Sequence, residues 1–349
     1  MMMESQNSAA FNASLSMVGE WLPTCSVVIC TRNRPEKLAV CLDAVSRQEY
    51  RQFEVVVVDN APSDQRTRQL VATHNARYIL EPIAGLARAR NTGARSCQTE
   101  VIAYLDDDSI PDPEWLSALL PEFRDPQVMV VTGHILHVNL TSAAFAEILT
   151  APAPNGNPWF SRRHILDRED PSWLPTACFG GMGDGGNMAF RRRAFDFWAG
   201  FDERLGRGGV LGAGEEHYAF FNILAMGYRV AYTPAAVIRH PNPRTMDEKR
   251  KRQREAQANV MAYVALLFAE QPKYRRAVAR YLLEEVKGNR GPWRVGPRPQ
   301  RVLSGWSTAF YRAAGVWKYL IESRNAKRAL SVAEQHQSAA KLLARTSNL

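Results

Sequence analysis

Runs of β-branched residues alternate with helix-like segments through the first third of the chain. The runs CSVVICT at 25–31, FEVVVVDN at 53–60 and VIAYL at 101–105 have the composition of short buried strands. Between the first two, RPEKLAVCLDAVSRQ places its apolar residues at helical spacing. Such a βαβ unit pairs its strands in parallel, because the crossover returns the chain to the same end of the sheet. The alternation predicts an α/β fold with a doubly wound, mostly parallel, Rossmann-like sheet.

Polar residues end each of these strands. Thr31 and Arg32 follow the first, Asp59 and Asn60 end the second, and an acidic triplet begins at 106. Ligands of doubly wound sheets bind outside the carboxyl ends of the strands. We therefore expect these side chains to converge on one rim.

Asp106, Asp107 and Asp108 form that acidic triplet. In an extended strand, side chains at i and i+2 point the same way, so Asp106 and Asp108 can present two carboxylates to one ligand. Hard oxygen ligands suit Mg²⁺ or Mn²⁺, which commonly complete their shell with water and substrate phosphate. The alternative is that Asp108 caps a helix that begins near Ile110.

Three other features allow two interpretations each. Asp59 can accept hydrogen bonds from a nucleobase or ribose, or form an Asx turn. One carboxylate of Glu215 and Glu216 can act as a general base whose pKa is raised by its neighbour, or both can be first-turn acids favoured by the helix dipole. His240 follows the strand-like AAVIR and is either a metal ligand or an ordinary strand-end histidine.

Several classes of protein are disfavoured. No GxGxxG follows the first strand and no GxxxxGK[ST] occurs, which argues against a dinucleotide-binding dehydrogenase and an ordinary P-loop. Five cysteines without metal-binding or disulfide spacing favour a reducing compartment. The N-terminus does not resemble a signal peptide, and the apolar run VMAYVALLFA at 260–269 is too short to span a membrane. We expect a cytoplasmic protein.

Charge divides the chain unevenly. Residues 246–349 hold 21 Lys and Arg against 8 Asp and Glu, whereas residues 1–245 hold 23 against 27. The basic third can face acidic lipid, acidic protein or nucleic acid, or be a solvated helical surface. We predict a disordered tail at 1–23, one α/β domain at 24–245 and a basic, mostly helical C-terminal region at 246–349.

The order of the motifs resembles the GT-A glycosyltransferases of glycosyltransferase family 2 over residues 24–245. The resemblance rests on SVVICTRNRPEKL, VVVVDN, GLARARNTG, YLDDDSIPDPEWL, GGNMAFRR and GEEHYAFFNILAMGYRVAYTPAAVIRH, in that order. It implies a GT-A fold with a C-terminal helical extension.

The resemblance also implies roles for individual residues. The base pocket would be lined by Thr31, Arg32, Glu36 and Asp59. Arg88 and Asn91 would lie near ribose or phosphate, with Arg90 as a neighbouring alternative. Asp108 would be the main protein ligand to the metal, with Asp106 as a further ligand. Asp106 and Asp107 would also bind the nucleotide sugar, through its ribose or by supporting the metal ligands. His240 would contact metal or phosphate. Gly186 and Asn187 would shape the sugar and acceptor side.

The implied reaction is inverting transfer of a sugar from a nucleoside diphosphate to an acceptor hydroxyl, with Mn²⁺ or Mg²⁺. Glu216 would be the base, although Glu215-Glu216 stands where the family usually has Glu-Asp. The alternative is a catalytically impaired nucleotide-sugar-binding protein of the same fold. We expect a role in cell-envelope polysaccharide, glycolipid or secondary-metabolite glycosylation, with a lipid-linked acceptor. The C-terminal region, including 260–269, would rest on the inner face of an anionic membrane. No RNP-like motif or zinc finger points to nucleic acid.

Overall fold

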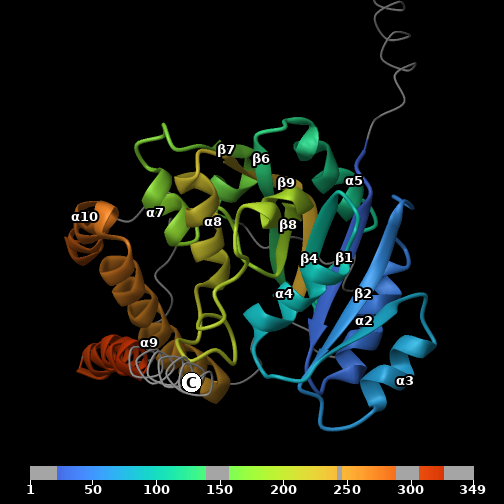
Figure 1. Ribbon diagram of the computed structural model, residues 1–349, viewed down its shortest axis with the longest axis horizontal. Coiled ribbons are helices and arrows are strands. Elements are labelled where there is room, and N and C mark those ends of the chain that lie inside the picture. The colour runs from blue at the N-terminus through green and yellow to red at the C-terminus, as the bar shows by residue number, and fades with distance from the viewer. Residues whose placement is uncertain (1–21, 139–156, 242–245, 288–305, 326–349) are drawn as a thin grey trace, which may run out of the picture.

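The computed structural model describes residues 22–138, 157–241, 246–287 and 306–325 (Figure 1). The first half alternates as expected. Its elements are β1 (Cys25–Thr31), α2 (Pro35–Val45), β2 (Phe53–Asn60), α3 (Arg66–Ala72), β3 (Arg77–Glu81), α4 (Leu86–Ser96) and β4 (Val101–Asp106). Most of the predicted N-terminal tail lies outside the described residues.

The second half has shorter and more varied elements. They are β5 (Ile110–Pro111), α5 (Trp115–Leu119), η1 (Leu120–Arg124), β6 (Val128–Val138), η2 (Pro158–Ser161), β7 (His164–Leu166), α7 (Trp173–Cys178), β8 (Asn187–Arg191), η3 (Arg192–Asp196), α8 (Glu215–Ala225) and β9 (Arg229–Pro241). After β9 come α9 (Met246–Glu270), η4 (Pro272–Tyr274), α10 (Arg275–Lys287) and a helix over 306–325.

One nine-stranded sheet runs through the molecule in the order β3-β2-β1-β4-β8-β6-β9-β5, with β7 paired to β9. Its first four strands are parallel, as the βαβ pattern predicts. β8 then enters antiparallel between β4 and β6, and the short strands β5 and β7 are also antiparallel to β9. The sheet is therefore parallel on the β1–β4 side and mixed beyond it.

Helices cover both faces of the sheet (Figure 1). α4 and α8 bury small and aromatic residues on one face, beside valines of β1 and β2. α2 and α5 cover the other face with leucines and with Trp115, which is fully buried. The strands carry β-branched residues that point alternately to the two faces. This three-layer arrangement is the α/β fold that the alternation predicts.

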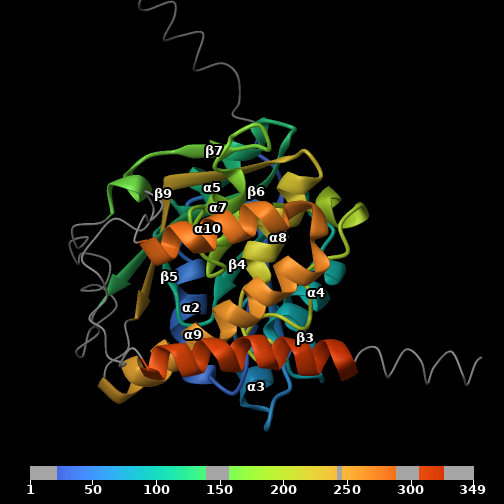
Figure 2. The same ribbon diagram turned by 90° about the vertical axis from the view of Figure 1, so that its left-hand side faces the viewer.

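The C-terminal helices form an additional layer outside α7 and α8 (Figure 2). The run 260–269 contributes Tyr263, Leu266 and Leu267 to a buried cluster with these helices. Most of this run is thus core, which corrects the expectation that it faces a membrane. Within the described residues, no helix combines the length and apolarity needed to cross a bilayer. The domain boundary near 245 stays a prediction.

Candidate active site

The carboxyl ends of the parallel strands meet at one edge. Thr31 is paired in register with Asp59 of β2, and Cys30 is paired with Asp106 of β4. A cavity of about 300 Å³ opens there, lined by residues that include Thr31, Arg32 and Asp106. Two more cationic residues, Arg34 and Arg207, also line it. Three guanidinium groups around one cavity favour a ligand that carries phosphate.

Two residues expected near the nucleotide have other partners. The side chain of Asn91 donates to the carbonyl of Phe201 at 2.8 Å and accepts from the backbone N–H of Phe201 at 2.8 Å. Arg88 forms an ion pair with Glu203 at 2.5 Å. These contacts fasten α4 to the segment before α8. Donor contacts by Arg88 and Asn91 stay predictions.

Asp59 and Glu36 are not among the residues that line this cavity. Glu36 is at the surface, where it pairs with Arg66 at 2.9 Å. Asp59 is fully buried and accepts a hydrogen bond from Tyr78 at 3.0 Å, while its Oδ1 atom has no hydrogen-bond partner. Burial raises the pKa of Asp59. A buried carboxylate oxygen without a partner is compatible with a ligand contact, which stays a prediction for Asp59.

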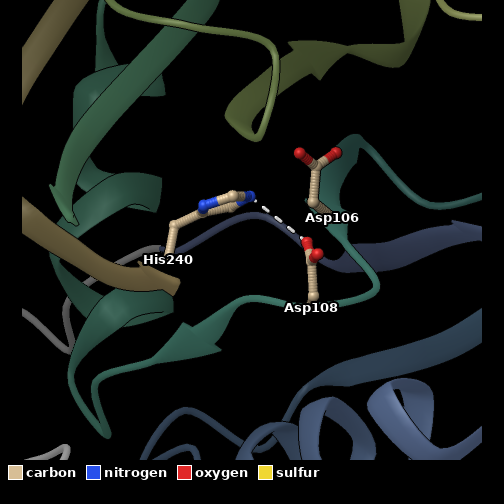
Figure 3. Close-up of side chains that lie close together, drawn as sticks. All are labelled: Asp106, Asp108 and His240. Atoms are coloured by element: carbon tan, nitrogen blue, oxygen red, sulfur yellow. Dashed lines mark ion pairs between the residues drawn. The ribbon is translucent and has the colours of Figure 1, made fainter. Parts of the chain in front are cut away.

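Asp106, Asp108 and His240 lie together at the end of β4 and on β9 (Figure 3). One ligand atom from each lies within 4.8 Å of the others, and His240 Nε2 is 3.2 Å from Asp108 Oδ1. Two carboxylates and an imidazole are a suitable donor set for Mn²⁺ or another divalent ion. The three residues expected as metal ligands are therefore close enough to share one ion.

Asp107 and Asp108 point to different partners. Asp107 accepts a hydrogen bond from Thr31 at 2.6 Å and pairs with Arg34, and burial raises its pKa to about 6. Asp108 pairs with Lys37 at 2.9 Å as well as with His240. Burial opposes ionisation of Asp108, but His240 and Lys37 outweigh it and hold the pKa below its usual range. Asp108 thus stays ionised at neutral pH.

The alternative role of Asp108 as a helix cap is wrong. Residues Ile110–Pro111 form β5, which pairs with β9. The next helix, α5, begins at Trp115, and Glu114 occupies the position before it. β5 and its pairing with β9 hold the chain directly after the acidic triplet. The carboxylates of the triplet therefore remain at the edge of the sheet.

Arg90 connects this cluster with the start of α8. Its guanidinium donates to Glu215 Oε1 at 2.7 Å and to the carbonyl of Gly185 at 2.9 Å, and it lies 3.7 Å from Asp106 Oδ1. Arg90 and Glu215 are both buried. Burial and the charge of Glu216 together outweigh Arg90 and raise the pKa of Glu215 to about 7. The contact at 2.7 Å holds Glu215 against Arg90, while burial favours its neutral form.

Glu216, the next residue of α8, has a different ion-pair partner. Its Oε1 atom is 3.3 Å from His217 Nδ1, and its Oε2 atom is buried without a hydrogen-bond partner. Burial alone would raise the pKa of Glu216, but His217 and then Arg90 overcome this and lower it. Glu216 and His217 also form a group with Asp184 in which one ligand atom of each lies within 4.8 Å of the others. Both glutamates lie in the first turn of α8, so the helix-dipole interpretation also applies to them.

The turn at 184–186 lies between these two groups. A Cβ atom on Gly186 would lie 2.9 Å from Asp106 Oδ2, and one on Gly185 would lie 3.1 Å from the Arg90 guanidinium. The two glycines thus allow close approach of the backbone to charged side chains. Asn187 is fully buried and is bonded to Trp115, His134 and Ala236. It holds β8 in place, and its expected contact to sugar or acceptor stays a prediction.

A second cavity of about 260 Å³ lies beside this turn. Its lining includes Asp184, His134, His137, Phe160 and Tyr232. Burial lowers the pKa of both histidines, so they are neutral at neutral pH. Asp184, at the start of the turn, lines this second cavity, whereas Gly186, at its end, lies beside Asp106, which lines the first cavity. The turn is therefore next to both cavities.

Sequence reasoning missed several charged residues of the site. Arg34 and Lys37 follow β1 at the start of α2. Their position just after a strand end could have indicated that they belong to the site. Arg207 and Asp184 lie in glycine-rich loops that have no periodic pattern. His217 follows Glu216 directly, but its pairing with that carboxylate depends on the geometry of the helix start.

Residues 26–197 match the family model for glycosyl transferase family 2. The chain is 27% identical over 220 residues to the pre-mycofactocin glycosyltransferase of Mycobacterium tuberculosis, covering 62% of this chain and 42% of that protein. It is 24% identical over 233 residues to the glucosyl-dolichyl phosphate glucuronosyltransferase of Haloferax volcanii, covering 62% of this chain and 68% of the relative. The chain thus matches less than half the length of the first of these relatives.

Solved structures share the fold. The mannosyltransferase PcManGT of Pyrobaculum calidifontis, in complex with GDP-Man and Mn²⁺, is 20% identical with a TM-score of 0.54, covering 86% of this chain and 88% of that one. TarS of S. aureus, in complex with UDP-GlcNAc, is 15% identical with a TM-score of 0.52, covering 88% and 92%. The solved structures show the shared GT-A fold, and the matched family model, together with the glycosyltransferase relatives, supports assignment of the chain to glycosyltransferase family 2.

Proposed function

We propose that the protein transfers a sugar from a nucleoside diphosphate to an acceptor hydroxyl with inversion. The observation that carries this proposal is the position of Glu216. Its Cβ atom lies beside Gly185 and the carboxylate of Asp106 lies beside Gly186, while the Oε2 atom of Glu216 has no hydrogen-bond partner. A base and a donor-binding carboxylate separated in this way suit attack from the face opposite the leaving group.

The donor would occupy the cavity lined by Arg32, Arg34 and Arg207. These guanidinium groups would hold the diphosphate by charge-assisted hydrogen bonds. Thr31 and Asp59 would face the base and ribose. Asp107 would hold the guanidinium of Arg34 in position through their ion pair. Glu36, Arg88 and Asn91 remain expected contacts of the donor.

Asp106, Asp108 and His240 would hold Mn²⁺ or Mg²⁺, and their donor atoms fit such an ion. When bound, the ion supplies neutralisation of the charge that develops on the leaving diphosphate. Lys37 and Arg34 add positive charge beside Asp108. They would share the stabilisation of the diphosphate.

Glu216 would accept the proton of the acceptor hydroxyl. Its pKa is lowered, so the carboxylate is ionised and able to accept a proton at neutral pH. His217 would orient this carboxylate through their contact at 3.3 Å. Glu215 would hold Arg90 next to Asp106, which couples the base side of the site to the donor side.

The acceptor would enter through the second cavity, beside Asp184. We infer a hydroxyl-bearing acceptor, and a lipid-linked one is supported by the relative whose name specifies a glucosyl-dolichyl phosphate. The five cysteines are free, which supports a reducing, cytoplasmic setting. We infer a position at the inner face of a membrane, where a lipid-linked acceptor would lie. Gly186 and Asn187 would shape the wall between donor and acceptor.

The test is a panel of nucleotide sugars with Mn²⁺, Mg²⁺ or EDTA, read by thermal shift and by release of nucleoside diphosphate. A cognate donor should raise the melting temperature, because it binds only the folded state. Glu216→Gln should lower turnover by about 10²- to 10⁴-fold and leave the donor-induced shift unchanged. Glu215→Gln removes the neighbouring carboxylate from the same helical turn, and we expect it to lower turnover less than Glu216→Gln.

Three results would count against parts of this proposal. Normal turnover of Glu216→Gln would exclude it as the base. Turnover that persists in EDTA would exclude the metal. Donor-induced stabilisation without turnover of the unmodified protein, across a range of acceptors, would favour the alternative of a catalytically impaired nucleotide-sugar-binding protein.

A further inference from the structure

The helix over 306–325 carries an exposed apolar stripe. Trp306 is 87% exposed, Phe310 67%, Trp317 64%, Leu320 51% and Ile321 45%. They are spaced by 4, 7, 3 and 1 positions, which places them on one side of an α-helix. The stripe runs almost the whole length of the helix, and two tryptophans are included in it. Such a face is unusual on a water-exposed surface.

The opposite side of this helix is fixed to α9. Gly315 packs so closely that a Cβ atom there would lie 2.0 Å from the carbonyl oxygen of Ala258. Tyr319 is buried, and its hydroxyl contacts Glu270 at 3.2 Å. Arg312 donates to Gln257 of α9 at 2.8 Å. These contacts set the rotation of the helix, so the apolar stripe is directed outward, as the exposure of its side chains shows.

Basic residues accompany the stripe. The helix has Arg312, Lys318 and Arg324 against one acidic residue, Glu322. It belongs to the region 246–349, in which Lys and Arg exceed Asp and Glu by 13. Tryptophan and phenylalanine on one side of a helix with Lys and Arg on the others are typical of helices that lie in the interface of a bilayer.

We propose that the helix over 306–325 is a docking surface for an anionic lipid bilayer, with Trp306, Phe310 and Trp317 inserted among the head groups. The charge decides between a bilayer and a second copy of the chain. A symmetric dimer through this face would bring two strongly basic regions together, whereas anionic lipid complements them. This surface stands apart from the proposed transfer reaction, and the test requires no turnover.

Flotation of the full chain with vesicles tests the proposal. The protein should float with vesicles of phosphatidylcholine and phosphatidylglycerol, and less with phosphatidylcholine alone. The double variant Trp306→Ala/Trp317→Ala should lower the vesicle partition coefficient by about tenfold or more, because two aromatic side chains no longer leave water. Higher salt should weaken binding of the unmodified protein, because it screens the basic residues.

The matched control is Leu80→Ala/Met226→Ala, which removes two exposed apolar side chains elsewhere. It should float like the unmodified protein, and both variants should keep the unmodified melting temperature. Equal flotation of the tryptophan variant and the unmodified protein would overturn the proposal, as would failure of the unmodified protein to float. A concentration-dependent dimer in light scattering that the tryptophan variant abolishes would instead assign the face to a second copy.

Discussion

Gly214 is the position at which the start of α8 meets the C-terminal layer. It has φ +94°, and a Cβ atom there would lie 2.8 Å from Cγ and 2.9 Å from Cδ2 of Tyr263. That ring is buried against Phe179 and Tyr218 and cannot move away without disturbing them. We therefore predict that Gly214→Ala is strongly destabilising.

The magnitude follows from a matched glycine at the other end of the same helix. Gly227 has φ +90° and nothing within 4 Å of an added Cβ atom. At both sites alanine bears the left-handed backbone strain of about 1–2 kcal/mol and the same opposing effect on the unfolded chain. Gly214→Ala adds overpacking of about 1–3 kcal/mol against Tyr263. The difference between the two variants should therefore be about 1–3 kcal/mol.

Urea unfolding of the two variants measures this difference. The midpoint of Gly214→Ala should lie below that of Gly227→Ala, with the slope of the transition unchanged. Equal midpoints would mean that the close contact with Tyr263 does not resist the added methyl group. They would refute the inference that Tyr263 of α9 packs too tightly against Gly214 to admit a methyl group.

Four further outcomes are expected. Arg90→Ala should lower the free energy of unfolding by about 3–5 kcal/mol, because it leaves the buried Glu215 carboxylate without its partner, and adding Glu215→Gln should restore part of the loss. Burial raises the pKa of Glu215 from 4.5 to about 7 in the folded state, so stability that is present below pH 4.5 is lost as the pH rises to about 7; urea midpoints of Glu215→Gln should lack this decline. Trp115→Phe should lower stability by about 1–3 kcal/mol in urea unfolding, because the buried Asn187 oxygen loses its donor at 2.8 Å. Desolvation raises the pKa of the partly buried Cys30 to about 12, so iodoacetamide should label it at about pH 8 far more slowly in the native protein than in urea, and equal rates would contradict the raised pKa.

Local patterns predict the first half of the fold well. β1 and β2 occupy the expected ranges, because β-branched runs bounded by polar residues specify buried strands without help from distant parts of the chain. The acidic triplet likewise begins at Asp106, the last residue of β4, so its place at the sheet edge is a consequence of chain order.

The second half depends on contacts that no local pattern reveals. β8 is only five residues long and lies between β4 and β6, so its direction is set by partners that are distant in sequence. The run 260–269 has the composition of a membrane contact, and only its packing against α7 and α8 identifies it as core. The exposed stripe at 306–325 is apolar in the same way, and burial alone distinguishes the two.

The bonds of Arg90 link the order of folding to the appearance of activity. Arg90 reaches Gly185, 95 positions later, and Glu215, 125 positions later. Contacts between such distant residues form only after the intervening chain has been arranged, since closing long loops is entropically unfavourable. In a chain in which α8 has not yet docked, Arg32 and Arg34 are already in place after β1, but Glu216 of α8 is not. Nascent or partly unfolded molecules would therefore lack the proposed base, and only the completed fold would bring both halves of the site together.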